Sequence, residues 1–373
     1  MNADELIYKS TNSKILEAGS FTWKAPSNIA LVKYWGKRTH QLPENPSISL
    51  TLDACFTQTT LAFLKKVKQT TSTIANTKLL SSEVPQFELF LDGERKIEFE
   101  EKIGIFIARI SQFVPFINDY KLTIKTHNSF PHSSGIASSA SGMAALALCI
   151  MSMEKALNPS MSEELFFKKA SFLARLGSGS AARSIKGELV VWGAHEAIDG
   201  STDLYGVEFP KEVHENFKNY QDTILLVDKG EKQVSSTVGH NLMHGHPFTT
   251  KRFDQANENL SKLTEILQNG DLNAFVTIVE SEALTLHAMM MTSNPYFILM
   301  KPNTLQIINK IWEFRVKTKS HICFTLDAGA NVHVLFPKKE KELVNTFIKS
   351  ELLQFCENNQ YICDNVGMGA KQM

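Results

Sequence analysis

A short segment rich in serine and glycine, FPHSSGIASSASG, spans residues 130–142 and precedes the apolar run MAALALCIM. Small residues let a backbone approach a ligand closely, and the first N–H groups of a helix are unpaired and carry partial positive charge. An anion, most often a phosphate, is the typical ligand of such a segment. The alternative is a serine-rich turn before a buried helix, because the segment is neither a Walker A motif nor a GxGxxG fingerprint.

A second segment, RLGSGSAARS at residues 175–184, again places glycine and serine after an expected helix and contains Arg183. Backbone N–H groups, hydroxyls and a guanidinium together can hold a phosphate or a carboxylate. A flexible link between two helices is the alternative. Two such segments in the same half of the chain favour anion binding.

Two further segments end expected strands with charged residues. In APSNIALVKYWGKR, the apolar run is followed by Lys33, Tyr34 and Lys37, which can offer two cations and a phenol to an anionic ligand. In FTLDAGANVHV, Asp327 lies between a strand and a glycine turn. Each has an ordinary alternative: an exposed lysine pair at a strand end, and an aspartate that stabilises a turn.

A histidine-rich segment, GHNLMHGHP, contains His240, His244 and His246. An HxxxH spacing can place two imidazoles on one helix face for zinc. Here Gly245 and Pro247 interrupt a helix, and no glutamate lies between the histidines. We therefore predict no metal site and expect a surface or dimer-contact segment.

Composition restricts the class of protein. The 373 residues are 43% hydrophobic, and 39 Lys and Arg balance 39 Asp and Glu, which argues against a broad nucleic-acid-binding surface. Five cysteines without a CxxC pair are typical of reduced thiols in a cytoplasmic protein. The N-terminal residues resemble no signal peptide, and no apolar stretch reaches the roughly 18 residues of a membrane span. We expect a cytoplasmic protein with neither nucleic-acid nor membrane partners.

The elements that must position these segments follow from the patterning. Strands are predicted at 22–32, 47–63, 121–128, 187–193, 222–228, 321–327 and 331–337, and helices at 138–157, 162–176, 250–268, 271–290, 303–318 and 339–357. Ser138 or Ser139 is expected to cap the first helix. Residues 65–78 are expected to form a loop or a surface hairpin, and 195–220 to contain a domain boundary. Strands and helices mix without a regular βαβ rhythm, which favours an α+β fold.

Taken together, NIALVKYWGKR, NSFPHSSGIASSASG, ARLGSGSAARS, VSSTVG and TLDAGAN resemble, in order and spacing, the mevalonate diphosphate decarboxylase family of the GHMP kinase superfamily. The resemblance implies a two-domain α+β fold. A GHMP kinase-like domain would span residues 1–205 and a ferredoxin-like domain 206–373, with the active site in the cleft between them. It also implies a homodimer that uses ATP and Mg²⁺ to decarboxylate mevalonate 5-diphosphate to isopentenyl diphosphate.

The resemblance also implies roles for individual residues. Asp327 would be the base at the tertiary hydroxyl of the substrate, and Arg183 would orient its carboxylate and phosphate. Tyr34 and Lys37 would hold the diphosphate, and Lys37 and Arg183 would offset negative charge during catalysis. The remaining substrate-binding residues would be Asn28, Ser178, Gly179, Ser180 and Ser236. The loop that binds the ATP phosphates would comprise Pro131, His132, Ser133, Ser134, Gly135, Ile136, Ala137, Ser138 and Ser139.

The sequence departs from the family pattern at several positions. His132, Ser133 and Ser134 stand where many members have Thr-Ala-Ala, Ala330 where many have proline, and His240 where many have methionine. These departures leave the exact nucleotide contacts open.

Three other functions remain open from the sequence. The chain could be a related kinase that phosphorylates mevalonate or its phosphate, a decarboxylase of the monophosphate, or a nucleotide-binding regulator without turnover. Asp327 together with Lys37 and Arg183 favours decarboxylation. An intact aspartate and both cations argue against a regulator, which has no need of a base.

Overall fold

The computed structural model describes residues 3–9, 15–67, 86–131, 136–230 and 236–373. Within them, eight strands form a larger sheet in the order β12-β1-β2-β5-β3-β4, with β6 paired to β2 and β7 paired to β6. The bounds of these strands are β1 Ala18–Val32, β2 Ser47–Lys65, β3 Phe87–Leu91, β4 Glu94–Arg95, β5 Tyr120–Asn128, β6 Leu189–Trp192, β7 Val207–Glu208 and β12 Lys371–Gln372.

Strand β1 changes its surroundings along its length. Its first residues are exposed, whereas every residue from Ala25 to Val32 is buried. A strand buried on both faces is a continuous apolar run rather than an alternating one, as in the sequence NIALV. The strand therefore delivers the residues that follow it, beginning with Lys33, into the interior of the protein.

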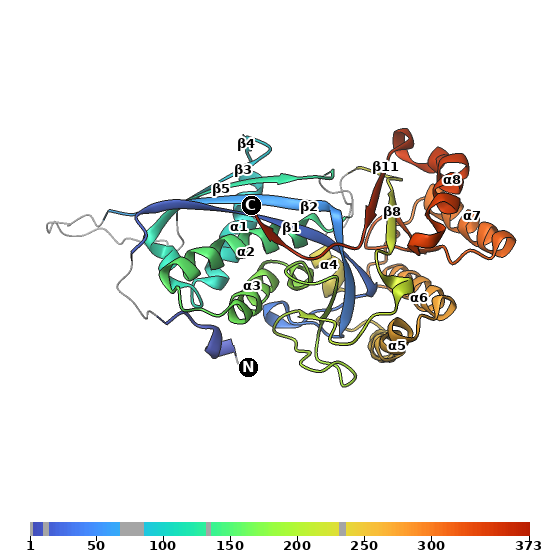
Figure 1. Cartoon of the computed structure of the whole chain (residues 1–373), viewed down its shortest axis with the longest axis horizontal. Coiled ribbons are helices and arrows are strands. Elements are labelled where there is room, and N and C mark those ends of the chain that lie inside the picture. Colours follow the sequence, from blue (N-terminus) through green and yellow to red (C-terminus); the bar gives the residue numbers. More distant parts are fainter. Residues whose placement is uncertain (1–2, 10–14, 68–85, 132–135, 231–235) are drawn as a thin grey trace.

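Three helices, α1, α2 and α3, cover one face of the larger sheet (Figure 1). Their bounds are α1 Ile97–Ile110, α2 Ser138–Leu157 and α3 Glu163–Gly177. Ser162 caps α3 by accepting a hydrogen bond from the N–H of Leu165. The serine cap expected for α2 is wrong: Ala137 occupies that position with a left-handed backbone (φ 48°), and Ser138 and Ser139 already belong to the helix.

The remaining strands form a smaller antiparallel sheet in the order β11-β8-β10-β9. Helices gather around it at the other end of the molecule (Figure 1). The bounds are β8 Gln221–Leu225, β9 Cys323–Thr325, β10 Val332–Phe336, β11 Tyr361–Asn365, α4 Ser236–Asn241, α5 Thr249–Asn269, α6 Leu272–Met291, α7 Pro302–Thr318 and α8 Lys341–Phe347. A π-helical turn, Ile348–Leu352, replaces the end of the helix predicted at 339–357.

The two sheets confirm the α+β class, and most predicted elements are present. The patterning missed α1, α4, β3, β4, β7, β11 and β12. Most of the polar segment at 65–78 lies outside the described residues. The division at residue 205 stays a prediction, because β7 and β12 come from the second part of the chain yet belong to the larger sheet.

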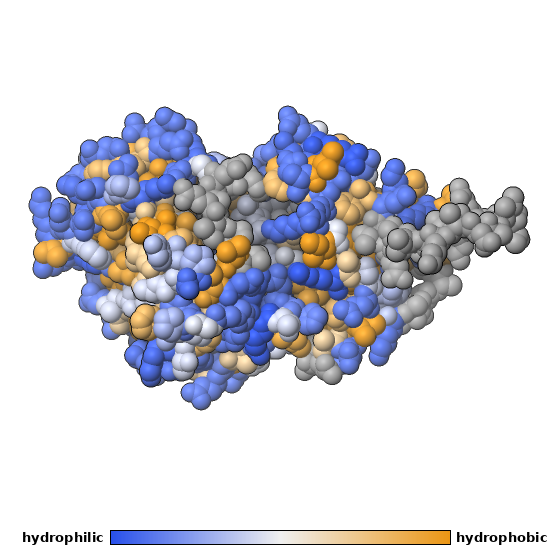
Figure 2. Space-filling model, turned by 180° about the vertical axis from the view of Figure 1, so that it is seen from behind, coloured by the Kyte–Doolittle hydropathy of each residue, from blue (hydrophilic) through white to orange (hydrophobic). Residues whose placement is uncertain are grey.

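Two helices correct the expectation that no stretch is apolar enough to span a membrane. By length and composition, Ser138–Leu157 and Leu272–Met291 both qualify, but 83% and 61% of their apolar windows are buried inside the protein. Apolar residues form scattered patches on the face shown in Figure 2. Burial in the core therefore accounts for the apolar character of both helices.

The carboxylate of Asp364 ties the smaller sheet to the larger one. It lies in β11 and is 5% exposed. Its two oxygens accept hydrogen bonds from the backbone N–H groups of Asp53, Ala54 and Cys55, at 2.9, 2.8 and 2.7 Å. These three groups belong to β2, at a point where the strand cannot use them for pairing in the sheet. Asp364 thus satisfies backbone donors that the pairing of β2 in the sheet leaves without a partner.

Replacing Asp364 with asparagine should lower the free energy of unfolding by about 2 kcal/mol, because the amide group turns a donor toward backbone donors. Chemical denaturation measures this change. The control is Asp53→Asn, the same substitution at a neighbouring exposed side chain. Equal stability of the two variants would contradict the role given to Asp364.

Candidate active site

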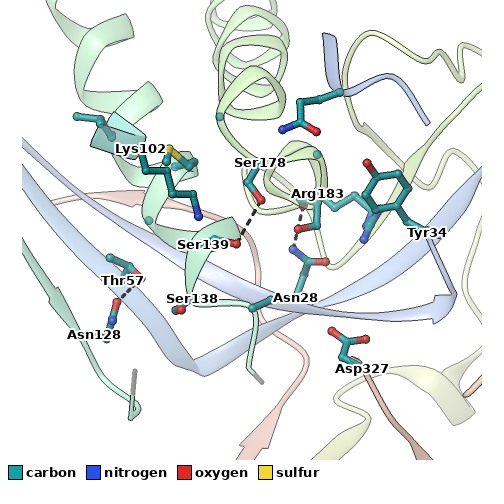
Figure 3. Close-up of a pocket in the computed structure, with 18 of the residues that line it drawn as sticks. Asn28, Tyr34, Thr57, Lys102, Asn128, Ser138, Ser139, Ser178, Arg183 and Asp327 are labelled. Carbon is teal, nitrogen blue, oxygen red and sulfur yellow. Dashed lines mark hydrogen bonds between the residues drawn. The ribbon is translucent and has the colours of Figure 1, made fainter. Parts of the chain in front are cut away.

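A cavity of about 570 Å³ lies between the end of β1, the first turns of α2, the segment after α3 and the turn after β9. This is an ordinary size for a small-molecule site. Figure 3 shows side chains from these elements converging on it. Of the residues predicted from the sequence, the cavity is lined by Asn28, Tyr34, Lys37, Ala137, Ser138, Ser139, Ser178, Gly179, Ser180, Arg183 and Asp327.

The other predicted residues have different places. Pro131 is exposed and Ile136 is buried, and neither lines the cavity. His132, Ser133, Ser134 and Gly135 lie outside the described residues. Ser236 begins α4, and its side chain lies outside the description as well. The roles of these residues stay predictions.

The closest ion pair in the cavity joins Lys33 to Asp327. The Lys33 ammonium is 2.9 Å from Asp327 Oδ1, and the two side chains are 2% and 27% exposed. Burial lowers the pKa of Lys33, and the charge of Asp327 partly offsets this effect. The sequence grouped Asp327 with Lys37 and Arg183, and all three line the cavity. It gave no role to Lys33, which is the lysine in contact with Asp327.

A second buried ion pair fixes the backbone of Lys33. Glu282 accepts a hydrogen bond from the Lys33 N–H at 2.8 Å, and Arg252 donates to the Lys33 carbonyl at 3.1 Å. Arg252 and Glu282 bond each other at 2.6 Å with both side chains fully buried. Asn259 donates to the other oxygen of Glu282. Helices α5 and α6 thus hold the lysine that β1 delivers. No motif in the sequence indicated this pair.

Arg183 is held by serines of β2. Its Nε and Nη1 donate to Ser49 Oγ and Ser47 Oγ, both at 2.6 Å, and its side chain lies against the ring of Trp192. Alternate residues of a strand share a face, so both hydroxyls point the same way. Burial lowers the pKa of Arg183 to about 10, which leaves it charged at neutral pH. Among the described residues none accepts a hydrogen bond from Nη2, so this nitrogen can serve an anionic ligand.

The hydroxyl of Tyr34 is buried, and no partner for it lies in the described part of the chain. An unpaired buried hydroxyl is unfavourable, so a ligand atom is its natural partner. Burial also raises the pKa of Tyr34, which keeps the hydroxyl protonated as a donor. A Cβ at Gly179 would lie 2.8 Å from this hydroxyl and 2.8 Å from the ring of Trp192. Close packing against Tyr34 therefore explains why the second glycine of GSGS, Gly179, has no side chain.

The start of α2 forms the end of the cavity where the sequence predicts that phosphates bind. Ser139 Oγ lies 3.3 Å from Ser178 Oγ, and Figure 3 shows the amine of Lys102 directed toward this pair. Burial, with the charges of Arg109 and Lys102, lowers the pKa of Lys37. Such a concentration of positive charge favours an anion. Lys102 belongs to the missed helix α1, which the periodicity of IEFEEKIGIFIARI could have indicated.

The donors present fit a magnesium ion that arrives with ATP rather than a dedicated protein site. Within the described ranges, no three His, Cys, Asp or Glu side chains come close enough to hold a metal. Mg²⁺ often relies on one or two protein oxygens, phosphates and water. The hydroxyls of Ser138 and Ser139 are the protein oxygens placed at the end of the cavity that α2 forms.

The histidine segment is only partly on the surface. Asn241, His244, Gly245 and Pro247 are exposed, whereas the side chains of His240 and His246 are buried. His246 Nε2 lies 3.1 Å from the carbonyl of Met289. The prediction that no helix continues through Gly245 and Pro247 is confirmed, because α4 ends at Asn241 and turns follow it. Another buried histidine, His287, donates to the carbonyl of Asp327, and burial lowers its pKa to about 4.

Comparison with known proteins decides the family. A profile of diphosphomevalonate decarboxylase-like N-terminal domains matches residues 25–203, and one of mevalonate 5-diphosphate decarboxylase C-terminal domains matches 223–370. The diphosphomevalonate decarboxylase of Ganoderma lucidum is 31% identical over 352 residues, covering 88% of this chain and 81% of that protein. The chain belongs to the diphosphomevalonate decarboxylase family. The enzyme of that name from Saccharomyces cerevisiae is 29% identical, covering 87% and 79%.

Solved structures of the family confirm the GHMP kinase-type fold. The mevalonate diphosphate decarboxylase of Staphylococcus aureus is 29% identical with a TM-score of 0.78, covering 95% of this chain and 98% of that one. The decarboxylase of Enterococcus faecalis is 29% identical with a TM-score of 0.77, covering 95% and 99%. A structure described as MDDEF in complex with MVAPP, AMPPCP and magnesium is 30% identical with a TM-score of 0.78 and the same coverage.

The buried Arg252–Glu282 pair generates a stability prediction. Glu282→Gln should lower the free energy of unfolding by about 3 kcal/mol, because Arg252 would keep a buried charge without a counter-charge. Urea denaturation measures the effect. Glu258→Gln is the control, since Glu258 contacts Lys262 at 3.8 Å on the surface, and it should change stability little. If Glu282→Gln left the free energy of unfolding unchanged, Arg252 would have another counter-charge.

Proposed function

We propose that this chain catalyses the ATP-dependent decarboxylation of mevalonate 5-diphosphate to isopentenyl diphosphate, ADP, phosphate and CO₂. One observation carries the proposal: Asp327, Arg183 and the start of α2 line the same cavity in a chain of this family. A carboxylate, a guanidinium and a phosphate-binding helix start are the groups that this reaction needs.

The first step transfers a phosphoryl group from ATP to the tertiary hydroxyl of the substrate. An ordinary carboxylate is a weak base toward an alcohol. In a loose phosphoryl transfer the alcohol becomes acidic only late, and a positioned Asp327 can then accept its proton. Lys33 fixes the position of Asp327 through their 2.9 Å contact. Lys37, Lys102 and Mg²⁺ bound with ATP reduce the repulsion between the two anionic substrates.

The second step breaks two bonds of the phosphorylated substrate. The C3–O bond breaks and phosphate leaves, which builds positive charge at C3. The bond to the carboxylate then supplies its electron pair to form the C=C bond, and CO₂ departs. Arg183 and Tyr34 orient the anionic groups with donors fixed by the protein. Hydroxyl and backbone donors suit the carboxylate, because tight neutralisation would hinder the loss of CO₂.

The competing functions make different products. A mevalonate or phosphomevalonate kinase would release ADP without CO₂, a monophosphate decarboxylase would prefer mevalonate 5-phosphate, and an inactive regulator would release neither product. One assay separates them: release of ADP and CO₂ from mevalonate, its 5-phosphate and its 5-diphosphate. We expect both products, in equal amounts, from the diphosphate. The proposal also includes the two domains at 1–205 and 206–373, a homodimer and a cytoplasmic location.

Asp327→Asn should lower kcat at least about 10²-fold, because an amide cannot accept the proton. Binding of ATP and mevalonate diphosphate should stay close to normal, and ADP and CO₂ release should fall together. Steady-state kinetics and calorimetry measure these quantities.

The matched control for Asp327→Asn is Asp228→Asn. Asp228 also follows a strand of the smaller sheet, where it accepts a hydrogen bond from the N–H of Gly230, but it does not line the cavity. Its variant should keep normal kcat. Persistent ADP release without CO₂ in Asp327→Asn would place Asp327 after phosphoryl transfer and overturn its role as the base.

Arg183→Lys keeps the charge but loses the planar fork that Ser47 and Ser49 hold. We expect kcat/KM for mevalonate diphosphate to fall about tenfold or more, as for loss of a bidentate contact. Kinetics with both substrates varied would show it. Wild-type kinetics in this variant would mean that Arg183 contributes only its positive charge and makes no bidentate contact.

A further inference from the structure

His240 lines the cavity although the family resemblance assigns it no role. It lies in α4 and is 8% exposed. Its ring packs against both neighbouring aromatic rings of the KYWGK segment, with ring centres 4.3 Å from Tyr34 and 4.6 Å from Trp35. The imidazole adds a polar group to a wall of the site that is otherwise formed here by two aromatic rings.

The hydrogen bonding of His240 fixes where its proton lies. Nδ1 accepts a hydrogen bond from the backbone N–H of Gly36 at 3.0 Å. Burial, with the charges of Lys37 and Arg183, lowers the pKa of His240 to about 3, so the ring is neutral at neutral pH. A neutral imidazole whose Nδ1 accepts must carry its proton on Nε2. In the described part of the chain no group accepts a hydrogen bond from this Nε2–H.

The surroundings of His240 indicate the ligand of that donor. Lys37 and Arg183 act on the ring electrostatically, and the unpaired hydroxyl of Tyr34 belongs to the ring stacked on it. All three are donors suited to an anion. A neutral N–H adds a fourth donor without adding a charge that the neighbouring cations would repel. A thioether in its place could not donate.

We propose that His240 Nε2–H donates a hydrogen bond to a phosphate oxygen of the bound substrate diphosphate. His240 is thereby a substrate-binding residue, and it raises the affinity of this chain for diphosphate. The identity of the substrate rests on the proposed function. The recognition of a diphosphate group by this donor does not, which allows a test without turnover.

The first experiment uses the wild-type chain and inorganic pyrophosphate as the probe. In ¹⁵N-labelled protein, the imidazole correlations of His240 should show the Nε2–H form, and the Nε2–H proton should shift downfield as pyrophosphate is added. The assignment comes from the signal missing in His240→Met. A proton on Nδ1, or an unchanged Nε2–H signal at saturating pyrophosphate, would overturn the proposal.

The second experiment compares variants kinetically. His240→Met removes the donor and keeps the bulk, so KM for mevalonate diphosphate should rise about tenfold, the loss expected for a hydrogen bond to a charged group, with kcat and the KM for ATP nearly unchanged. His240→Gln should recover most of the affinity, because its amide nitrogen can reach the place of Nε2. His244→Met, at the exposed histidine of the same segment, is the control and should behave as wild type.

Two further outcomes separate the anionic groups and the two proposals. Calorimetry with pyrophosphate and with mevalonate should show that His240→Met weakens the binding of pyrophosphate and leaves the binding of mevalonate unchanged. If it weakened only mevalonate, the donor would serve the carboxylate and the proposal would fail. If the wild type turned over no mevalonate compound but pyrophosphate still shifted the His240 signal, the proposed function would fail while diphosphate recognition by His240 stood.

Discussion

The burial of one ammonium group, that of Lys33, constrains the whole active site. A lysine that is 2% exposed loses nearly all its hydration, which is tolerable only if counter-charges and hydrogen bonds replace it. Asp327 supplies the counter-charge from the turn after β9, and Glu282 and Arg252 hold the Lys33 backbone from α5 and α6. The charge of Lys33, at the end of the larger sheet, is thus compensated entirely by the other half of the protein. The geometry of the site therefore depends on the relative position of the two halves.

The segment after β1 distributes its side chains to different walls of the cavity. Lys33 faces Asp327, whereas Tyr34 lies against Trp192 and His240. Gly36 then turns the chain with φ +99°, and a Cβ there would lie 2.9 Å from the ring of Phe253. The turn brings Lys37 toward the positive groups of α1. Five consecutive residues therefore supply the partner of Asp327, a buried hydroxyl and a second cation of the cavity, which explains why this segment is such a distinctive motif.

The sequence predicted the types of site residue better than their partners. Arg183, Asp327 and the serines of α2 were found because their types and their positions at element ends are local properties. The contact between Lys33 and Asp327 could not be predicted, since it depends on contacts of the Lys33 backbone with two distant helices. The Arg252–Glu282 pair was missed for the same reason: two ordinary charges on amphipathic helices give no signal until the helices face each other. His240 was expected to lie with the rest of its segment at the surface or in a dimer contact, whereas its ring is buried against Tyr34 and Trp35.

The cations of the cavity couple ligand binding to the stability of the fold. Burial lowers the pKa of Lys33, Lys37 and Arg183, so each is less favourably charged in the protein than in water. A cation whose pKa is lowered in the folded state destabilises that state at every pH below its ordinary pKa, which includes neutral pH. Within the described ranges, Lys33 is the one of these cations that has a carboxylate in contact with it. An anionic ligand relieves the penalty on the other two, and anything that binds only the folded state stabilises it. A neutral donor such as His240 can contact an anionic ligand without adding to the electrostatic penalty on the folded state. An uncharged imidazole therefore fits beside Lys37 and Arg183, where a further cation would not.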